Sequence, residues 1–213
     1  VWTGVAYTVT YDGNLNSGGA VPSSGSATFG SSFTASSNSG SLVRTGYTFA
    51  GWNTAANGTG TTFSAGGSST WSIASNTTFF ARWIPAVTSI GFTSDAGSDG
   101  TYKSDDTVSV TVMFPAAVTV TGSPRIQLQG LSTKYATYSS GSGTTSLVFT
   151  YLVVSGDNDA DGLSISADAI DLNGGTIRDA ASGNVTLTHS SITTQATHRV
   201  DTQTPTVSGV TST

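Results

Sequence analysis

The sequence predicts a mainly β protein, and three observations carry that prediction. Ser and Thr make up about a third of the 213 residues, Gly numbers 26, and charged residues are only 9%, far from the average globular chain. Thr and Val favour the pleated surface of a sheet, whereas Ser, Asn, Asp and Gly favour turns over helices. Aromatic residues recur inside short alternating runs, which supply the apolar area that folding requires. We therefore expect folded all-β domains without long helices.

The first half of the chain is a series of short alternating runs, each bounded by Gly, Asn or Ser. Such runs predict strands separated by turns. In order they are YTVTYDGN from Tyr7, SATFGSSF from Ser26, GYTFAGWN from Gly46, GTTFS from Gly60 and TTFFARW from Thr77.

The second half begins where aromatic density drops and Pro85 interrupts the pattern. Seven short strands with regular turn signals are expected there, a pattern typical of a β-sandwich. The chain thus divides into domains at 1–85 and 86–202, with 203–213 as an orphan C-terminal strand. The seven runs are VTSIGFTS from Val87, TVSVTVMF from Thr107, RIQLQ from Arg125, KYATYSS from Lys134, SLVFTYLVV from Ser146, LSISADAIDL from Leu163 and NVTLTHSS from Asn184.

Residues 6–84 resemble the Listeria-Bacteroides repeat, the internalin-type B repeat of bacterial surface proteins. The resemblance implies a small β-grasp-like fold. It rests on YTVTYDGN, on RTGYTFAGWNTAANGTGTTFSAG at 44–66 and on TTFFARW, with a Gly-Tyr-x-Phe-x-Gly-Trp core and a closing Ala-x-Trp. Those motif positions are Gly46, Tyr47, Phe49, Gly51, Trp52, Ala81 and Trp83.

Residues 87–201 resemble the immunoglobulin-like repeats of very large bacterial surface and secreted proteins. The phrases that carry this are DGTYKSDDTVSVTVMFPAAVTVTGSPRIQL at 99–128, GDNDADGLSISADAIDLNGGTIRDAASGNVTLTH at 156–189 and HRVDTQTPTV at 198–207. The resemblance implies an immunoglobulin-like β-sandwich. In such arrays the last phrase leads into the next repeat, so the tail reads as the first strand of a module whose remainder the sequence lacks.

Charge and composition exclude several classes of partner. The net charge is −5 and the seven Lys and Arg are spread singly, so no basic stripe is available to neutralise the phosphates of a nucleic acid. No apolar run approaches the roughly 20 residues of a membrane span, and the start at Val1 carries no signal segment. The absence of cysteine excludes disulfides and cysteine-bound zinc.

The best candidate for a bound ion is the acidic stretch DNDADGLSISAD. Asp157, Asp159 and Asp161 precede a glycine at the D-x-D-x-D-G spacing of calcium loops, and Asp168 falls at the twelfth position. The alternative is an acidic turn in which Asp157 and the following Asn cap their own backbone. A looser group, Asp95, Asp99, Asp105 and Asp106, has no diagnostic spacing and is expected to form solvated turns.

An enzyme is not expected. His189 and His198 are the only histidines and lack a spaced metal partner, no G-x-S-x-G elbow occurs, and Glu is absent. We expect His189 at a strand end on the surface and His198 with Arg199 in a linker.

The aromatic motif of the first half could form either a sugar-binding platform or a core, and the core is favoured because so small a domain must bury its few aromatics. Trp2 and Trp71 lie outside the motif and are the candidates for exposed contacts. Sequons at Asn57, Asn76 and Asn184 are possible sites of N-glycosylation.

These observations predict a structural subunit of a bacterial extracellular or cell-surface filament or stalk that binds copies of itself. The tail, with Pro205, Val207 and Val210, is expected to add as a strand to a sheet of the next copy. The alternative for the tail is a remnant of a longer multidomain protein that is ordered only by crystal or intrachain contacts. The alternative is an adhesin or carbohydrate-binding module that recognises surface glycans or host proteins. Calcium is the one cofactor considered.

Overall fold

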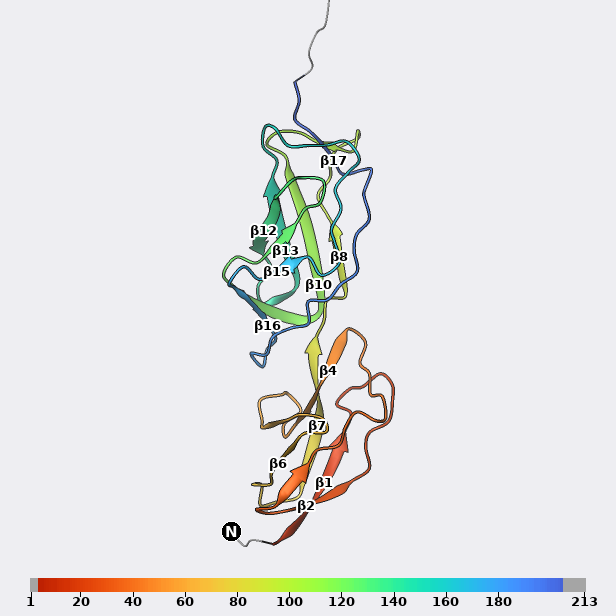
Figure 1. Ribbon diagram of the computed structural model, residues 1–213, viewed down its shortest axis with the longest axis vertical. Helices are drawn as coiled ribbons and strands as arrows, with labels where there is room; N and C mark the ends of the chain where they lie inside the picture. Colours follow the sequence, from red (N-terminus) through yellow and green to blue (C-terminus); the bar gives the residue numbers. More distant parts are fainter. Residues whose placement is uncertain (1–3, 205–213) are drawn as a thin grey trace, which may run out of the picture. The chain divides into compact units, whose positions relative to one another are not determined.

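The computed structural model describes residues 4–204, and that range contains strands and turns but no helix (Figure 1). The mainly β fold predicted from composition is therefore confirmed. It follows that the described part of the chain holds no helix able to cross a membrane.

The chain divides into two compact units, which are described separately. Unit 1 comprises residues 1–86 together with 178–186, and unit 2 comprises residues 87–177 together with 187–213. The segment 178–186 groups with unit 1 through short contacts: Thr186 N–H donates to Pro85 O at 2.9 Å, and Arg82 lies 3.9 Å from Asp179. The sequence pattern gave no sign of this excursion.

Unit 1 is built on a mixed five-stranded sheet in the order β2-β1-β7-β4-β5. Its first and last strands, β1 and β7, lie parallel in the middle, and an antiparallel strand flanks each of them, as expected for a β-grasp-like sheet. A separate pair joins β3 to β6. The strands are β1 (Ala6–Asp12), β2 (Gly25–Thr28), β3 (Ser32–Thr34), β4 (Tyr47–Asn53), β5 (Thr62–Phe63), β6 (Ser68–Thr70) and β7 (Thr77–Pro85).

Unit 2 contains a seven-stranded sheet in the order β15-β11-β12-β13-β10-β16, with β8 also paired to β10. A three-stranded sheet, β14-β17-β9, accompanies it. The strands are β8 (Ser89–Phe92), β9 (Thr101–Tyr102), β10 (Thr107–Thr121), β11 (Arg125–Gln127), β12 (Tyr135–Ser140), β13 (Thr144–Leu152), β14 (Asn158–Asp159), β15 (Ile170–Asp171), β16 (Thr176–Arg178) and β17 (Arg199–Asp201).

Strand β10 shows why alternating sequence becomes a sheet with one buried face. Val108, Val110 and Val112 are buried, while the residues between them are half-buried and lie on the opposite face, because successive side chains of a strand point to opposite sides. Pairing with β13 sets Val112 opposite Leu147 and Val110 opposite Phe149, so the buried face continues across the sheet.

Nearly every run predicted to be a strand contains one, and two expectations need correction. NVTLTHSS forms only isolated bridges, because its backbone pairs with separate partners: Asn184 with Arg178, and Thr186 with Ala86. Arg199 does not lie in a linker; it begins β17, which pairs with β9 and β14. A short strand with one buried residue, Val200, carries too little periodicity for the sequence to reveal it.

Candidate functional site

The acidic stretch 157–168 does not wrap around a single point. Asp157 and Asp159 are buried, whereas Asp161 and Asp168 are exposed. The Asp168 carboxylate accepts a hydrogen bond from His189 N–H at 2.8 Å. The backbone of Asp168 itself has a φ of 54°. Asp168 is therefore held by the backbone of His189, whereas Asp157 contacts Tyr151, Val154 and Lys134.

Asp157 is the centre of a polar network. One carboxylate oxygen accepts hydrogen bonds from the Tyr151 hydroxyl at 2.5 Å and Val154 N–H at 2.9 Å, and the other lies 3.5 Å from Lys134 Nζ. Burial opposes ionisation, but these donors and the lysine charge outweigh it and hold the pKa of Asp157 below its usual value. Burial and the neighbouring carboxylate raise the pKa of Tyr151, so its hydroxyl stays a donor.

The same network fixes the end of the described chain. Thr202 Oγ donates to Asp157 O at 2.8 Å and accepts from Gly156 N–H at 2.9 Å. The chain is therefore tied to the 154–157 turn just after β17.

Only one of the two carboxylate oxygens of Asp159 accepts hydrogen bonds among the described residues. Its Oδ1 accepts from the N–H groups of Asp161 and Gly162 at 3.2 Å, as in an Asx turn, while Oδ2 is buried without a hydrogen-bond partner in the described part of the chain. Oδ2 faces Gly130, where the approach is so close that no side chain fits and φ is 99°.

The four aspartates thus do not form the ligand set that their spacing suggests. Between residues 4 and 204, no group of three or more His, Cys, Asp or Glu side chains is placed to hold a metal ion. Calcium binding by this stretch stays a prediction. The melting temperature in calcium and in chelator would check it, because an ion bound only by the native state raises stability.

The histidines are separated and each has a structural role. His189 accepts a hydrogen bond from Ala169 N–H through Nε2, at 3.0 Å. His198 is half-buried with its ring 5.1 Å from that of Phe92 and 5.9 Å from that of Tyr102, and burial lowers its pKa. The Thr197 hydroxyl lies 3.2 Å from His198 Nδ1. In the described residues neither histidine belongs to a group of three or more side chains that could hold a metal ion.

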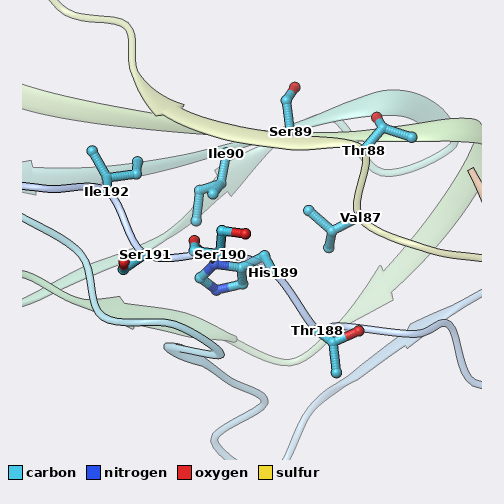
Figure 2. A pocket seen from close by; sticks show the side chains of 9 residues that line it. All are labelled: Val87, Thr88, Ser89, Ile90, Thr188, His189, Ser190, Ser191 and Ile192. Carbon is cyan, nitrogen blue, oxygen red and sulfur yellow. Dashed lines mark hydrogen bonds between the residues drawn. The ribbon is translucent and has the colours of Figure 1, made fainter.

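A groove of about 410 Å³ lies within unit 2, between β8 and the segment 188–192 (Figure 2). On the β8 side, Val87 and Ile90 point toward the segment, and Ile192 lies on the opposite wall. Ser and Thr side chains and the imidazole of His189, which Figure 2 draws beside Ser190, complete the lining. The lining therefore combines three apolar side chains with hydroxyl groups and one imidazole.

The groove exists because β8 is an edge strand. β8 pairs with β10 alone, and no backbone hydrogen bond joins it to 188–192 in the described chain. Thr93 N–H donates to Ser109 O, so the alternation of an antiparallel ladder directs the N–H and C=O of Ile90 away from β10, outward from the free edge of β8, while the Ile90 side chain points toward 188–192 (Figure 2). On the opposite wall, the backbone N–H and C=O of Ile192 are both hydrogen-bonded to Ile165.

A second groove, of about 320 Å³, lies in unit 1 between β5 and β6. Hydroxyl groups of Ser and Thr line most of it, and the Phe63 ring forms the apolar part. Phe63 is half-buried because it stacks on Phe79 at 4.6 Å.

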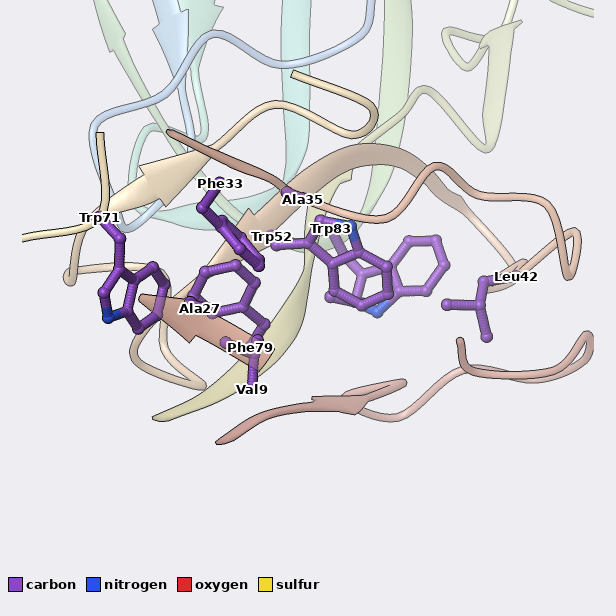
Figure 3. Packing of buried hydrophobic residues seen from close by; sticks show 10 residues of the cluster. Val9, Ala27, Phe33, Ala35, Leu42, Trp52, Trp71, Phe79 and Trp83 are labelled. Carbon is purple, nitrogen blue, oxygen red and sulfur yellow. The ribbon is translucent and has the colours of Figure 1, made fainter. Parts of the chain in front are cut away.

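The aromatic motif forms a core rather than a platform (Figure 3). Trp52 and Trp83 are buried, as predicted for the motif, and Trp52 Nε1–H donates to Ser36 O at 2.7 Å. Trp71, expected to be exposed, is fully buried. The prediction was wrong because the Trp71 ring packs edge-on against the Phe33 ring, with 5.0 Å between the ring centroids. The residues around Trp71 are mostly Ser, so the local sequence shows no apolar pattern that would predict its burial.

The remaining expectations concern the surface and the chain ends. Asn57, Asn76 and Asn184 are all exposed, as glycosylation requires, although two of their side chains are engaged in hydrogen bonds, with Thr59 and with Thr8 N–H. Trp2 lies outside the described residues, as does the tail with Pro205, Val207 and Val210.

Comparison with known proteins bears on unit 1. Residues 7–82 match the family model of the Listeria-Bacteroides repeat domain. That family is a surface-protein domain found in bacterial surface proteins and is not an enzyme family, which fits a surface or structural role. No curated protein and no solved structure matches the chain. The immunoglobulin-like resemblance of the second half therefore rests on its sequence phrases and its sandwich-like strands.

Sequence reasoning missed the β8 groove. The alternation in VTSIGFTS predicts a strand. Whether an edge of that strand stays unpaired depends on the neighbouring strands, and these come from distant segments of the chain. The sequence carried no signal for this groove, because residues 184–191, which form only isolated bridges, have a pattern that predicts a strand.

Proposed function

We propose that the protein is a structural subunit of a bacterial extracellular or cell-surface filament or stalk, in which copies join head to tail by addition of the C-terminal tail to a sheet. The observation that carries this proposal is how the polar side chains are used. In the described residues they hold turns together and are not gathered into a catalytic or metal-binding group.

Asn53 is the clearest example of this use. It is buried, its Oδ1 accepts from the N–H groups of Ala55 and Gly60, and its Nδ2 donates to Gly58 O, Gly60 O and Thr62 Oγ1. One side chain thus forms hydrogen bonds with several groups of the loop between residues 55 and 62, which makes the loop rigid. Rigid loops between packed sheets suit a spacer, and the similarity of residues 7–82 to a surface-protein repeat supports the same role.

The tail supplies the means of assembly. Residues 203–213, QTPTVSGVTST, combine β-branched residues with Ser and Gly and carry no charged side chain, a composition suited to a strand that pairs with an exposed edge. A tail that binds a different surface of the next copy makes a heterologous contact, which propagates rather than closes.

Electron microscopy of the full chain and of a variant lacking residues 203–213 tests the proposal. The full chain should form fibres and the truncated chain should remain monomeric. A length-matched control replaces both Val207 and Val210 with Ser and should also fail to assemble. Fibres from the truncated chain, or monomers only from the full chain, would contradict the proposal.

The second candidate is a carbohydrate-binding adhesin module, and the groove between β5 and β6 is the observation that favours it. Hydroxyl groups beside an aromatic ring are the groups that meet the polar edges and apolar face of a sugar. Glycan-array binding that is lost in Ser69→Trp, which fills the groove, and kept in Ser26→Trp, on the separate strand β2, would support this candidate.

A further inference from the structure

We propose that the acceptor of the tail is the free edge of β8 at the mouth of this groove, and that residues 205–213 of a second copy add there as a strand antiparallel to β8. This inference rests on the proposed function, because it names the surface to which the tail would bind. Three observations carry it: the free backbone edge of β8, the apolar side chains of Val87 and Ile90 beside that edge, and the pattern of the tail sequence.

The free edge provides hydrogen bonds that a strand alone can complete. The N–H and C=O of Ile90 face outward from the free edge of β8, at the mouth of the groove, and segment 188–192 makes no backbone bond to β8. An incoming strand satisfies such groups at once, which is the basis of recognition by strand addition.

The apolar groups of the tail have the same spacing as those of the groove. Proline, valine and a second β-branched residue stand at positions 85, 87 and 90 in PAVTSI, and at positions 205, 207 and 210 in PTVSGV. In an antiparallel arrangement Val207 lies opposite Ile90 and Val210 opposite Val87. Both apolar pairs then form together, and Ser208 lies opposite Ser89.

The antiparallel direction follows from the strand already present. β8 pairs with β10 in antiparallel fashion, and antiparallel ladders are slightly more stable per residue than parallel ones. The tail also carries no charged side chain, and the lining of the groove contains no Asp or Glu, so the added strand buries no charged side chain there.

Disulfide trapping tests this assignment cleanly because the chain contains no cysteine. The variant Ser89→Cys with Ser208→Cys places two thiols opposite each other at a pair not hydrogen-bonded to each other, where Cα atoms are about 4.5 Å apart, within the range of a disulfide. Oxidation should give a ladder of covalent oligomers on denaturing gels. The matched control, Thr137→Cys with Ser208→Cys, puts the first thiol on an exposed residue of β12 and should give no ladder.

The outcomes separate this inference from the proposed function. Fibres that need residues 203–213 but show no ladder through position 89 would overturn the assignment to the β8 edge and leave tail-driven assembly intact. Fibres that persist without the tail would overturn both. A cross-link formed within single chains, seen as a monomer of altered mobility, would show that the occupant is the same copy and would also overturn the inference.

Competition provides a second readout that does not depend on new cysteines. A synthetic peptide of residues 203–213, added to the intact protein, should occupy the free edge of β8 and shorten the fibres. The same peptide with Ser at positions 207 and 210 should leave fibre length unchanged. Equal effects of the two peptides would contradict recognition through the valines.

Discussion

The two units solve the same packing problem with different side chains. The buried cluster of unit 1 is dominated by large aromatic rings, with Trp52, Trp71 and Phe79 fully buried. Unit 2 fills its interior mainly with Val, Ile and Leu, as in β10, where Val108, Val110 and Val112 are all within 1% of full burial. An aromatic side chain buries 150–250 Å², so a small unit needs few of them to form a core.

The two kinds of core should differ in how they tolerate substitution. An aromatic core depends on ring shape and on edge-to-face geometry, such as that of Tyr11 with Trp52 at 4.7 Å. Aliphatic residues of similar volume replace one another at lower cost, so the core of unit 2 should tolerate such exchanges better than that of unit 1. The contrast makes the following predictions.

The largest effect is expected for Trp52→Ala. The substitution removes a fully buried ring and leaves Ser36 O without its donor, so it should cost about 3 to 5 kcal/mol of unfolding free energy. All four Trp residues precede residue 84, so tryptophan fluorescence during denaturant unfolding reports this loss. A native-like midpoint would show that the ring is not part of the core.

In unit 2, Leu147→Ala should cost about 2 to 5 kcal/mol, because it leaves a cavity opposite Val112. The matched control, Leu147→Met, keeps the volume and should cost less than about 1.5 kcal/mol. Far-UV circular dichroism during thermal unfolding measures both. If the two variants proved equally unstable, the aliphatic core would be as shape-specific as the aromatic one, and the comparison between the units would fail.

Within unit 1, two Trp→Phe substitutions separate hydrogen bonding from packing. Trp52 Nε1 donates to Ser36 O, whereas Trp71 Nε1 is buried with no partner in the described chain. Trp52→Phe should therefore cost about 1 kcal/mol more than Trp71→Phe, the usual net contribution of one hydrogen bond. Chemical denaturation of both proteins in parallel gives the difference, and a larger cost for Trp71→Phe would be inconsistent with these contacts.

The smallest effect concerns pH and unit 2. The folded pKa of Asp157 lies below its usual value of about 3.9, so its stabilising contribution is fully present above about pH 4 and is lost as the pH falls through the folded pKa. Asp157→Asn should flatten this acid limb of the stability curve. Asp161→Asn, at an exposed position in the same stretch, is the control. An acid limb left unchanged by Asp157→Asn would place the titrating group elsewhere.

The sequence alone determined the fold class, most strands and the core of unit 1. These features follow from local periodicity and from composition: β10 could be predicted from TVSVTVMF, and the burial of Trp52 from its place in a recurring motif. Each depends on neighbours within a few residues, so the pattern is visible along the chain.

Only the tertiary structure decided which edges stay free, which carboxylates meet and which aromatic rings are covered. The aspartates at 157–168 have a calcium-loop spacing, yet Asp157 is drawn to Tyr151 and Lys134, and Asp168 to the backbone of His189. Trp71 is buried by Phe33, which lies 38 positions earlier in the chain. These outcomes depend on pairings between distant segments, and the loop-closure entropy and packing that select such pairings leave no local pattern in the sequence.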